Sequence, residues 1–449
     1  MTKLRLLQVD YAKIAEKIVH SPSFPELRWL SWKRCPIKFT PTNLSKLCVL
    51  DLSDSDITES WMGWKHIKVE KNLKVLNLCH CVKLSQLLDV SANLHLEELI
   101  LENCSSLTTI GASIGHLKSL TILNVKGCKR LEHLSTSIGQ LSSLKTLDIR
   151  RTNICQLPEA LGSLEALTEL YVGFSKIQLP SSTHHLRNLK TLSGAHDIIP
   201  QAGRYSIPPN HLPELPSSLK YLDASFCKMK SLTTLSKLTD LEVLYLDYCE
   251  NLLEVPTTIN SLTRLEKLSI LNCYKLAKIG SLEGLVSLQH LEICYCGSLK
   301  TFPKLRGLKK LRYLELSNDV FIELEGLEGL YSLEKLIIKY CYYLRKIPNL
   351  SDLKNVVCIE IRVCPESPGI EGLEGLNPLQ ELIIKACVSW RKIKLPKELR
   401  MLHILKLKNL SEIEGLEGLD SLKQLYIREC PSLRKIQLPK KLRELEIQH

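Results

Sequence analysis

Aliphatic residues recur along almost the whole chain in the pattern LxxLxLxxC, where x is any residue. Counted from the first apolar position of each unit, the repeats begin at residues 4, 27, 47, 73, 96, 120, 144, 167, 189, 219, 241, 265, 288, 311, 333, 356, 379, 399, 422 and 442. Most steps between these starts are 22 to 24 residues. This consensus, with a period of about 20–29 residues, is typical of the leucine-rich repeat.

Each LxL core predicts a short strand, because successive residues of a strand point to opposite faces. We expect Leu244 and Leu246 to point inward and Tyr245 and Asp247 to point outward. One repeat cannot bury its leucines alone, so neighbouring coils must stack to complete the core. The predicted fold class is an α/β leucine-rich-repeat solenoid. A curved parallel β-sheet lines its concave face, and its convex side is irregular or short-helical.

Cysteine usage follows the same period. Twelve of the 17 cysteines stand at the position that ends a strand, namely residues 35, 81, 104, 128, 227, 249, 273, 296, 341, 364, 387 and 430. We interpret them as small buried residues at a tight turn. The pairs Cys79/Cys81 and Cys294/Cys296 have no accompanying histidine pair, so we expect neither a metal site nor a disulfide. The odd cysteine count and the lack of a signal peptide favour reduced thiols and a cytoplasmic or nuclear location.

The repeat is interrupted once. The step from Leu189 to Leu219 is 30 residues, and residues 197–216 carry five prolines. We therefore predict an N-terminal array at 1–196, a Pro-rich irregular insertion at 197–218 and a C-terminal array at 219–449 that ends without a clear cap. The insertion is either a tolerated surface segment, or a functional loop or hinge. EGLEGL recurs at 325–330, 371–376 and 414–419, which indicates pairs of repeats copied as blocks.

Two outward groups in the C-terminal array are candidates for binding. A basic column contains Lys339, Arg362, Lys385 and Arg428 and is interrupted by Leu405. Its repulsion needs counter-charges, for which Glu360, Glu381 and Glu429 are near enough in sequence. An aromatic group contains Phe226, Tyr245, Tyr248, Tyr295 and Tyr340. Exposed aromatic residues beside charges are typical of protein-binding hot spots. The hypothesis is that residues 220–430 present this patch to an acidic protein surface; the alternative is that each side chain is singly exposed without a partner.

The remaining sequence features argue against other classes of protein. The net charge of +12 is spread over 449 residues, and no basic tail indicates nucleic-acid binding. No apolar run is long enough for a membrane span. The phosphate-binding, dinucleotide-binding, zinc-protease and nucleophile-elbow motifs are absent. We therefore expect a binding scaffold without a cofactor rather than an enzyme.

Residues 24–41, FPELRWLSWKRCPIKFTP, together with Leu47–Ile57 and Trp61, are the specific part of a family resemblance. They resemble the start of the repeat domain in plant intracellular nucleotide-binding leucine-rich-repeat immune receptors, most closely those with an N-terminal TIR domain. The resemblance implies that the chain recognises a pathogen effector or a guarded host protein. It also implies that the chain holds a receptor's nucleotide-binding domain inactive.

The resemblance has one departure, because the TIR and nucleotide-binding domains are missing from this chain. We therefore expect a fragment of a longer receptor or a truncated product, which can bind or regulate but not signal through those domains. The runner-up is the substrate-recognition subunit of a ubiquitin ligase, which also uses cysteine-ended repeats. The first 20 residues already belong to a repeat and leave no room for an F-box. A receptor-kinase ectodomain would need a signal peptide, a membrane span and the LxGxIP repeat form.

Overall fold

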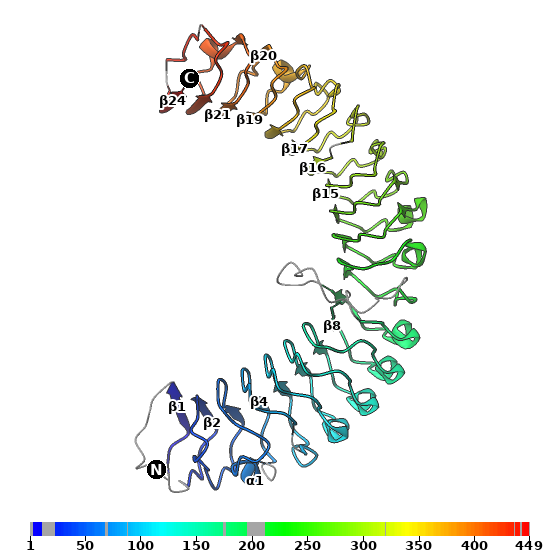
Figure 1. The fold of residues 1–449 in the computed structure, drawn as a ribbon, viewed down its shortest axis with the longest axis vertical. Helices are drawn as coiled ribbons and strands as arrows, with labels where there is room; N and C mark the ends of the chain where they lie inside the picture. The colour runs from blue at the N-terminus through cyan, green and yellow to red at the C-terminus, as the bar shows by residue number, and fades with distance from the viewer. Residues whose placement is uncertain are drawn as a thin grey trace. The chain divides into compact units, whose positions relative to one another are not determined.

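The computed structural model describes residues 3–10, 23–67, 71–87, 89–173, 177–194, 212–318, 320–434, 436–440 and 442–448. The chain divides into two compact units, Met1–Ala224 and Ser225–His449. Both are stacks of coils in which each coil contributes one strand to a parallel ladder (Figure 1). The predicted leucine-rich-repeat solenoid is therefore confirmed.

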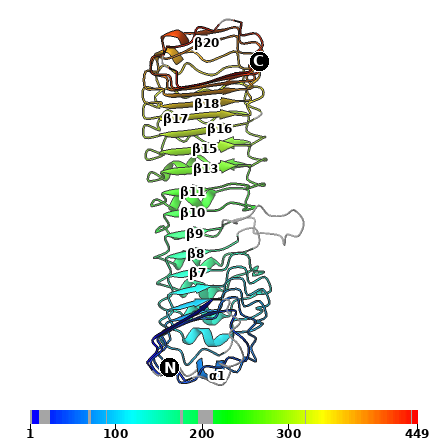
Figure 2. The same ribbon diagram turned by 90° about the vertical axis from the view of Figure 1, so that its left-hand side faces the viewer.

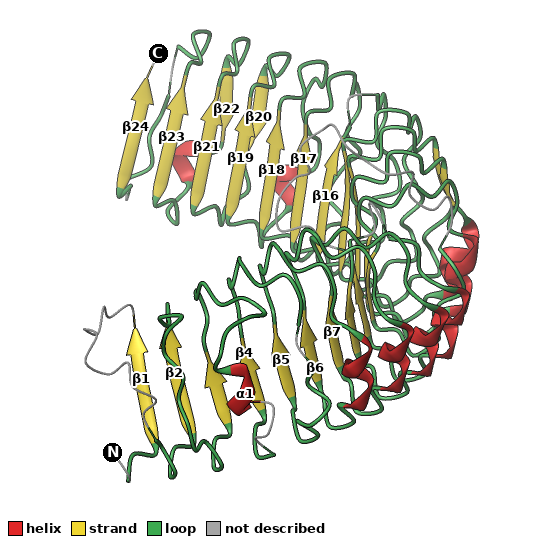
Figure 3. Ribbon diagram, turned by 60° about the horizontal axis from the view of Figure 1, so that its bottom comes forward, coloured by secondary structure: helices red, strands yellow, loops and turns green. Residues whose placement is uncertain are grey.

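In the first unit, successive strands pair in chain order. They are β1 (Leu6–Asp10), β2 (Trp29–Lys33), β3 (Val49–Asp51), β4 (Val75–Asn77), β5 (Glu98–Ile100), β6 (Ile122–Asn124), β7 (Thr146–Asp148), β8 (Glu169–Tyr171), β9 (Thr191–Ser193) and β10 (Tyr221–Asp223). The return segments carry one short α-helix and several 3₁₀ helices. These are α1 (Trp64–Ile67), η2 (Ala112–His116), η3 (Thr136–Gln140), η4 (Glu159–Ser163) and η5 (Ser181–His185). The helices lie on the side of the coils away from the strands (Figure 3).

In the second unit, the main ladder again follows chain order, with neighbouring strands lying side by side like rungs (Figure 2). Its strands are β11 (Val243–Tyr245), β13 (Lys267–Leu271), β15 (His290–Cys294), β16 (Tyr313–Ser317), β17 (Lys335–Lys339), β18 (Cys358–Arg362), β19 (Glu381–Lys385), β21 (Met401–Leu405), β23 (Gln424–Arg428) and β24 (Glu444–Gln448). The return segments contain two short strand pairs, β12 (Glu254–Val255) with β14 (Lys278–Ile279) and β20 (Lys392–Lys394) with β22 (Glu412–Glu414). They also contain the 3₁₀ helices η6 (Thr233–Lys237), η7 (Thr257–Ser261), η8 (Leu373–Gly375) and η9 (Leu416–Gly418).

The core is the stack of inward aliphatic residues that the repeat predicts. Leu268 pairs in register with Leu291, which pairs with Leu314, so equivalent positions stand directly above one another. All three have no exposed surface. Burying such a side chain stabilises the fold by about 2 kcal/mol, and each coil completes the burial of its neighbour. Inward leucines therefore fix the register of the whole ladder within each unit.

The cysteines that end the strands are buried, as predicted, and all 17 cysteines are free thiols. The thiol of Cys104 donates a hydrogen bond to the carbonyl oxygen of Leu78 in the preceding coil, at 3.1 Å. Cys273 does the same to Leu246 at 3.0 Å. Burial raises the pKa of Cys104 to about 12, so the thiol keeps its proton and remains a donor at neutral pH. The cysteine thus joins adjacent coils as well as filling the turn.

Strand length differs between the units, and the central outward residue explains much of it. In the first unit Asn77 and Asn124 accept hydrogen bonds through Oδ1 from the backbone N of Cys79 and Lys126, at 2.9 and 3.0 Å. This local side-chain bond uses the amide that would otherwise extend the ladder. Strands β3 to β10 stop after three residues, including β5, which lies between Asn77 and Asn124 in the ladder, whereas β1 and β2, with Gln8 and Ser31 at the centre, run for five. From β13 to β23 the central residue is neither Asp nor Asn, and the strands run for five residues.

Most of the predicted insertion, residues 197–211, lies outside the described residues, so its boundaries stay a prediction. Leu212 and Leu215, in the described part of the predicted insertion, are buried. In the part of the chain that the structure describes, no helix is both long and apolar enough to cross a membrane.

Candidate protein-binding face

Each five-residue strand of the second unit presents three side chains away from the core. We call them the first, central and last outward positions, which on β17 are Lys335, Ile337 and Lys339. Register pairing lines up equivalent positions of neighbouring strands into columns about 4.8 Å apart. The predicted basic residues all fall in the column of last outward positions. This column includes Lys339, Arg362, Lys385, Leu405 and Arg428.

Carboxylates in the central column neutralise one part of this basic column. Lys339 Nζ lies 3.4 Å from Glu315 Oε1 and 3.3 Å from Glu360 Oε1. Arg362 Nε lies 2.6 Å from the same Glu360 oxygen. Glu360 is only 8% exposed, so it is a buried charge that two cations share. The three residues therefore form a lattice in which removal of one charge leaves the others uncompensated.

Lys385 is the exception in the column. It lies in register between Arg362 and Leu405, and no carboxylate among the described residues is within 4.0 Å of its Nζ. The expected counter-charge from Glu381 is at the opposite end of β19. Glu429 pairs with Lys406 at 3.5 Å instead. Arg428, the last member of the column, forms an ion pair with Glu446. Within the described part of the chain, Lys385 is thus a half-buried cation on this face without a counter-ion.

A second polar network, which was not predicted from the sequence, lies on and around strands β11, β13 and β15. The Ser269 hydroxyl lies 2.8 Å from Asp247 Oδ1 and 3.2 Å from Glu292 Oε2. His290 Nε2 lies 2.7 Å from Glu292 Oε1, and this bond holds the pKa of the Glu292 carboxyl below its usual range. The imidazole stacks on Tyr313 with ring centroids 4.1 Å apart. The signal in the sequence was glutamate at the central outward position, as at Glu292. The register of the strands places that position beside Ser269.

Four of the five predicted aromatic residues share an unusual backbone position. Phe226, Tyr248, Tyr295 and Tyr340 each directly precede a strand-ending turn residue and have φ between 53° and 63°. This left-handed conformation is unfavourable by about 1–2 kcal/mol for residues other than glycine. The same conformation occurs at the equivalent turn of other coils, as at His80 and Asn103, so the repeat imposes it. The rings are therefore fixed by the ladder at the ends of the strands.

The turn rings form two pairs. Phe226 and Tyr248, on successive coils, stack in parallel with centroids 4.8 Å apart. Tyr295 and Tyr340 belong to coils that are two apart, yet their centroids are only 5.9 Å apart. Ser317 is the last outward residue of the intervening strand and is only 1% exposed. The two rings lean together over this strand and leave 44% of Tyr295 and 38% of Tyr340 exposed.

Tyr245 is the fifth predicted aromatic residue and lies elsewhere on the face. It occupies the central outward position of β11, in register with Ser269. Lys267 Nζ lies 5.1 Å from its ring centroid, within the range of a cation–π interaction. Tyr245 therefore has a charged neighbour and does not join the turn pairs.

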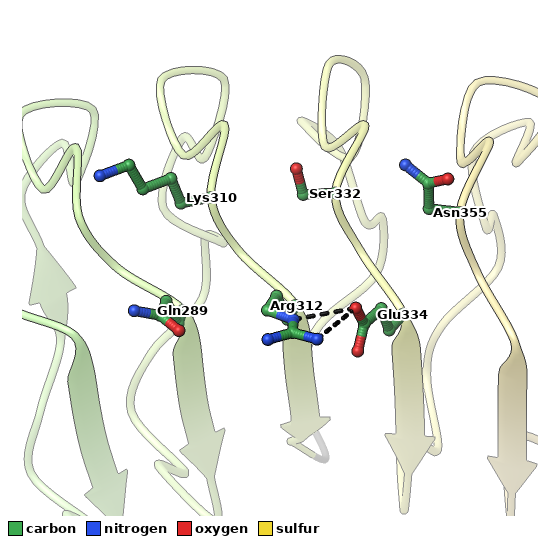
Figure 4. Close-up of a pocket in the computed structure, with 6 residues that line it drawn as sticks. All are labelled: Gln289, Lys310, Arg312, Ser332, Glu334 and Asn355. Atoms are coloured by element: carbon green, nitrogen blue, oxygen red, sulfur yellow. Dashed lines mark hydrogen bonds and ion pairs between the residues drawn. The ribbon is translucent and has the colours of Figure 1, made fainter.

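A shallow pocket opens at the other end of the strands, just before the first outward residues (Figure 4). It is lined by Gln289, Lys310, Arg312, Ser332, Glu334 and Asn355. Arg312 Nε donates to Glu334 Oε1 at 2.9 Å, and both side chains are about half exposed. These six residues include no nucleophile paired with a base, the arrangement used in covalent nucleophilic catalysis. No group of three or more possible ligands for a metal ion occurs among the described residues.

Comparison with known proteins supports the resemblance to plant disease resistance proteins over somewhat more than half of the chain. Disease resistance protein RPS4B of Arabidopsis thaliana is 29% identical over 265 residues, covering 57% of this chain and 21% of that protein. Protein SUPPRESSOR OF npr1-1, CONSTITUTIVE 1 of the same species is 32% identical over 264 residues, covering 54% of this chain and 17% of that protein. Disease resistance protein RPV1 of Vitis rotundifolia is 34% identical over 146 residues, covering 26% of this chain and 10% of that protein.

The chain spans about a fifth of the length of the first two of these relatives. No protein-family model matches it. Among solved structures, an LRR protein of Leptospira interrogans superposes with a TM-score of 0.52 at 19% identity, covering 94% of this chain and all of that one. This likeness shows the leucine-rich-repeat fold.

Proposed function

We propose that this chain is a protein-binding leucine-rich-repeat scaffold of plant defence, and that its strand face in the second unit is where a partner binds. By analogy with the relatives, the partner is a pathogen effector or a guarded host protein, met in the cytoplasm or nucleus. In a longer receptor the same array would also hold a nucleotide-binding domain inactive. Binding rather than catalysis is the proposed activity.

The observation that carries this proposal is the set of strained, exposed aromatic turns beside an unpaired cation. Tyr295 and Tyr340 keep left-handed backbones although asparagine or glycine would relieve the strain, as Asn272 does at the same turn position. Aromatic residues lose little side-chain entropy on binding and dominate the energy of interfaces. The face is also rigid, because its strands are hydrogen-bonded on both sides.

The structure changes how the proposal is tested. Charge reversal of Lys339, Arg362 and Lys385 together is the obvious experiment for a basic patch. Reversing Lys339 and Arg362 would surround the buried Glu360 with like charge, so a loss of binding would be confounded with unfolding. Replacing turn tyrosines by glycine avoids this problem, because the left-handed backbone is where glycine is favoured.

The test is proximity labelling in plant tissue with the full chain fused to a biotin ligase. Three chains are compared: the wild type, the triple variant Tyr248→Gly/Tyr295→Gly/Tyr340→Gly, and the control Asn272→Gly. The control introduces glycine at the equivalent turn of another coil without removing an aromatic ring. The expected result is enrichment of a nucleotide-binding immune receptor or a pathogen protein by the wild type and the control, and its loss with the triple variant. Enrichment of ubiquitin-ligase adaptor proteins would favour the alternative role. An unchanged set with the triple variant would contradict the strand face as the binding site.

A further inference from the structure

The tyrosine pair and the unpaired lysine recur at a regular interval along the ladder. Tyr295 follows β15, Tyr340 follows β17 and Lys385 ends β19, so each lies two strands beyond the one before. Two strand spacings are about 10 Å, which is also the length of about three residues of extended chain. A peptide lying across the strands can therefore place every third residue opposite one of these three side chains.

The tyrosine end of this row is suited to an apolar group. The rings of Tyr295 and Tyr340 approach each other over Ser317 and form a continuous, partly exposed aromatic surface. Their backbone amides donate to Ser317 O at 2.6 Å and to Arg362 O at 2.9 Å, so both turns are tied to the next coil. A ligand side chain resting on the pair meets a surface that is already ordered, which lowers the entropic cost of binding.

The lysine end is suited to an anion. Lys339 and Arg362 already neutralise carboxylates of the face, whereas Lys385 has no such partner among the described residues. Its neighbours in the column are the cation Arg362 and the apolar Leu405. A carboxylate placed at Lys385 would gain a counter-charge beside an apolar residue, where the local dielectric is lower than in water.

We propose that this row binds an extended acidic peptide segment of the partner. An aliphatic or aromatic side chain rests on Tyr340, the ring of the pair that is two strands from Lys385, and a carboxylate three residues away pairs with Lys385. The inference rests on the proposed function, in which this face binds protein, and it assigns the chemistry of the bound segment. Main-chain groups of such a segment would run across the strands rather than along them, so recognition comes from side chains.

The test uses the purified full chain and short fluorescent Gly/Ser peptides in an anisotropy titration. One peptide carries leucine and, three residues later, glutamate; a second has lysine in place of the glutamate; a third has leucine and glutamate adjacent. The first peptide is expected to bind at least about tenfold more tightly than the other two, the difference that a single good charge pair can supply.

Variants assign that preference to residues. Lys385→Glu should weaken binding of the glutamate peptide about tenfold or more and raise binding of the lysine peptide. Lys397→Glu, with the same charge change on an exposed residue between β20 and β21, should leave both peptides unaffected. Tyr340→Gly should weaken all leucine-containing peptides, whereas Asn272→Gly should not. Equal binding of the glutamate and lysine peptides, or an equal effect of the two lysine variants, would overturn the inference.

The two proposals fail separately. If no peptide shows the preference but the triple glycine variant still loses the labelled partner in plant tissue, the peptide assignment is wrong and the strand face remains the binding site. If the labelled partners are unchanged by that variant, the proposed function itself fails. Circular dichroism of each variant shows whether the ladder is intact.

Discussion

The two units bury the same kind of core but differ in what they show to solvent. Leu123 in the first unit and Leu336 in the second are equivalent inward residues, and neither has exposed surface. Outward, the first unit places asparagine or aspartate at the centre of many strands, with small or polar residues such as Asn103 and Gly127 at the left-handed turns. The second unit places glutamate at the centre of several strands, such as β15, β16 and β18, and tyrosine at several of those turns.

The difference shows how one repeat yields two surfaces. An asparagine at the central position caps its own strand, so the next outward residue leaves the ladder. From β13 to β23 of the main ladder another residue, such as Ile337 or Glu360, stands there; the strand continues, and the last outward residues, such as Lys339 and Arg362, align in a column. Two of the central residues, Glu315 and Glu360, neutralise Lys339 and Arg362 in that column. The residue at the central position therefore influences both the width of the face and its charge pattern.

The largest expected effect tests what the units share. Leu123→Ala and Leu336→Ala each remove a fully buried side chain from the centre of a unit, and each should lower the free energy of unfolding by about 2–5 kcal/mol. Urea denaturation followed by circular dichroism measures both. The outward variant Lys335→Ala, on the same strand as Leu336, should change the free energy by less than about 0.5 kcal/mol. A large loss in one unit alone would mean that the two cores are not equivalent.

The second-largest expected effect tests the difference in charge pattern between the outward faces of the two units. Glu360→Gln removes the buried charge shared by Lys339 and Arg362, and should destabilise the second unit by about 2–3 kcal/mol. The counterpart in the first unit is Asp148→Asn, because Asp148 also forms an ion pair with a basic residue, Arg150. An asparagine there can still accept from the Arg150 backbone N, so the loss should be nearer about 1 kcal/mol.

The dependence of stability on salt concentration is the control for the Glu360→Gln prediction. High ionic strength should reduce the destabilisation by Glu360→Gln, because screening weakens the repulsion between Lys339 and Arg362 once their counter-charge is gone. Denaturation curves of wild type and variant at low and high sodium chloride measure the difference. If Glu360→Gln is no more harmful than Asp148→Asn at low salt, the lattice of charges does not hold the second face together.

Much of this organisation was predictable from the sequence, because inward leucines at one spacing determine the register. Once register is known, Glu315 and Glu360 can be placed beside Lys339. The contact between Tyr295 and Tyr340 was not predictable, since it depends on side-chain rotations that reach across an intervening strand. The left-handed turn was foreshadowed by Asn103, Gly127 and Asn272 before cysteines. At Tyr295 and Tyr340 the residue type does not indicate this turn, because tyrosine does not favour a left-handed backbone.

A smaller effect addresses the cap that distinguishes the first unit. Asn124→Ala removes the acceptor for the Lys126 amide, and should lower the free energy of unfolding by about 1 kcal/mol. Asn124 Nδ2 also donates to Glu102 Oε2 at 3.2 Å, so the control is made in a Glu102→Gln background. There Asn124→Asp keeps an acceptor oxygen at the same place without carboxylate repulsion, and its loss should be smaller. Urea denaturation compares the two. Equal losses from alanine and aspartate would show that the side-chain bond to the amide is not what ends these strands.

The smallest effect concerns turn strain in the second unit and has the opposite sign. Val363 has φ 56° and is β-branched, the kind of side chain that fits a left-handed backbone least well. Val363→Gly should therefore raise the free energy of unfolding by about 0.5–1 kcal/mol, since the relief of strain exceeds the entropy that glycine loses on folding. Asn272→Gly, at the same turn position, should change it far less, because asparagine already tolerates the conformation. Urea midpoints compare the two variants. If Val363→Gly destabilises the chain instead, packing of the valine side chain outweighs the backbone strain. The left-handed backbones of Tyr295 and Tyr340 would then not indicate that these tyrosines are retained at a cost in stability.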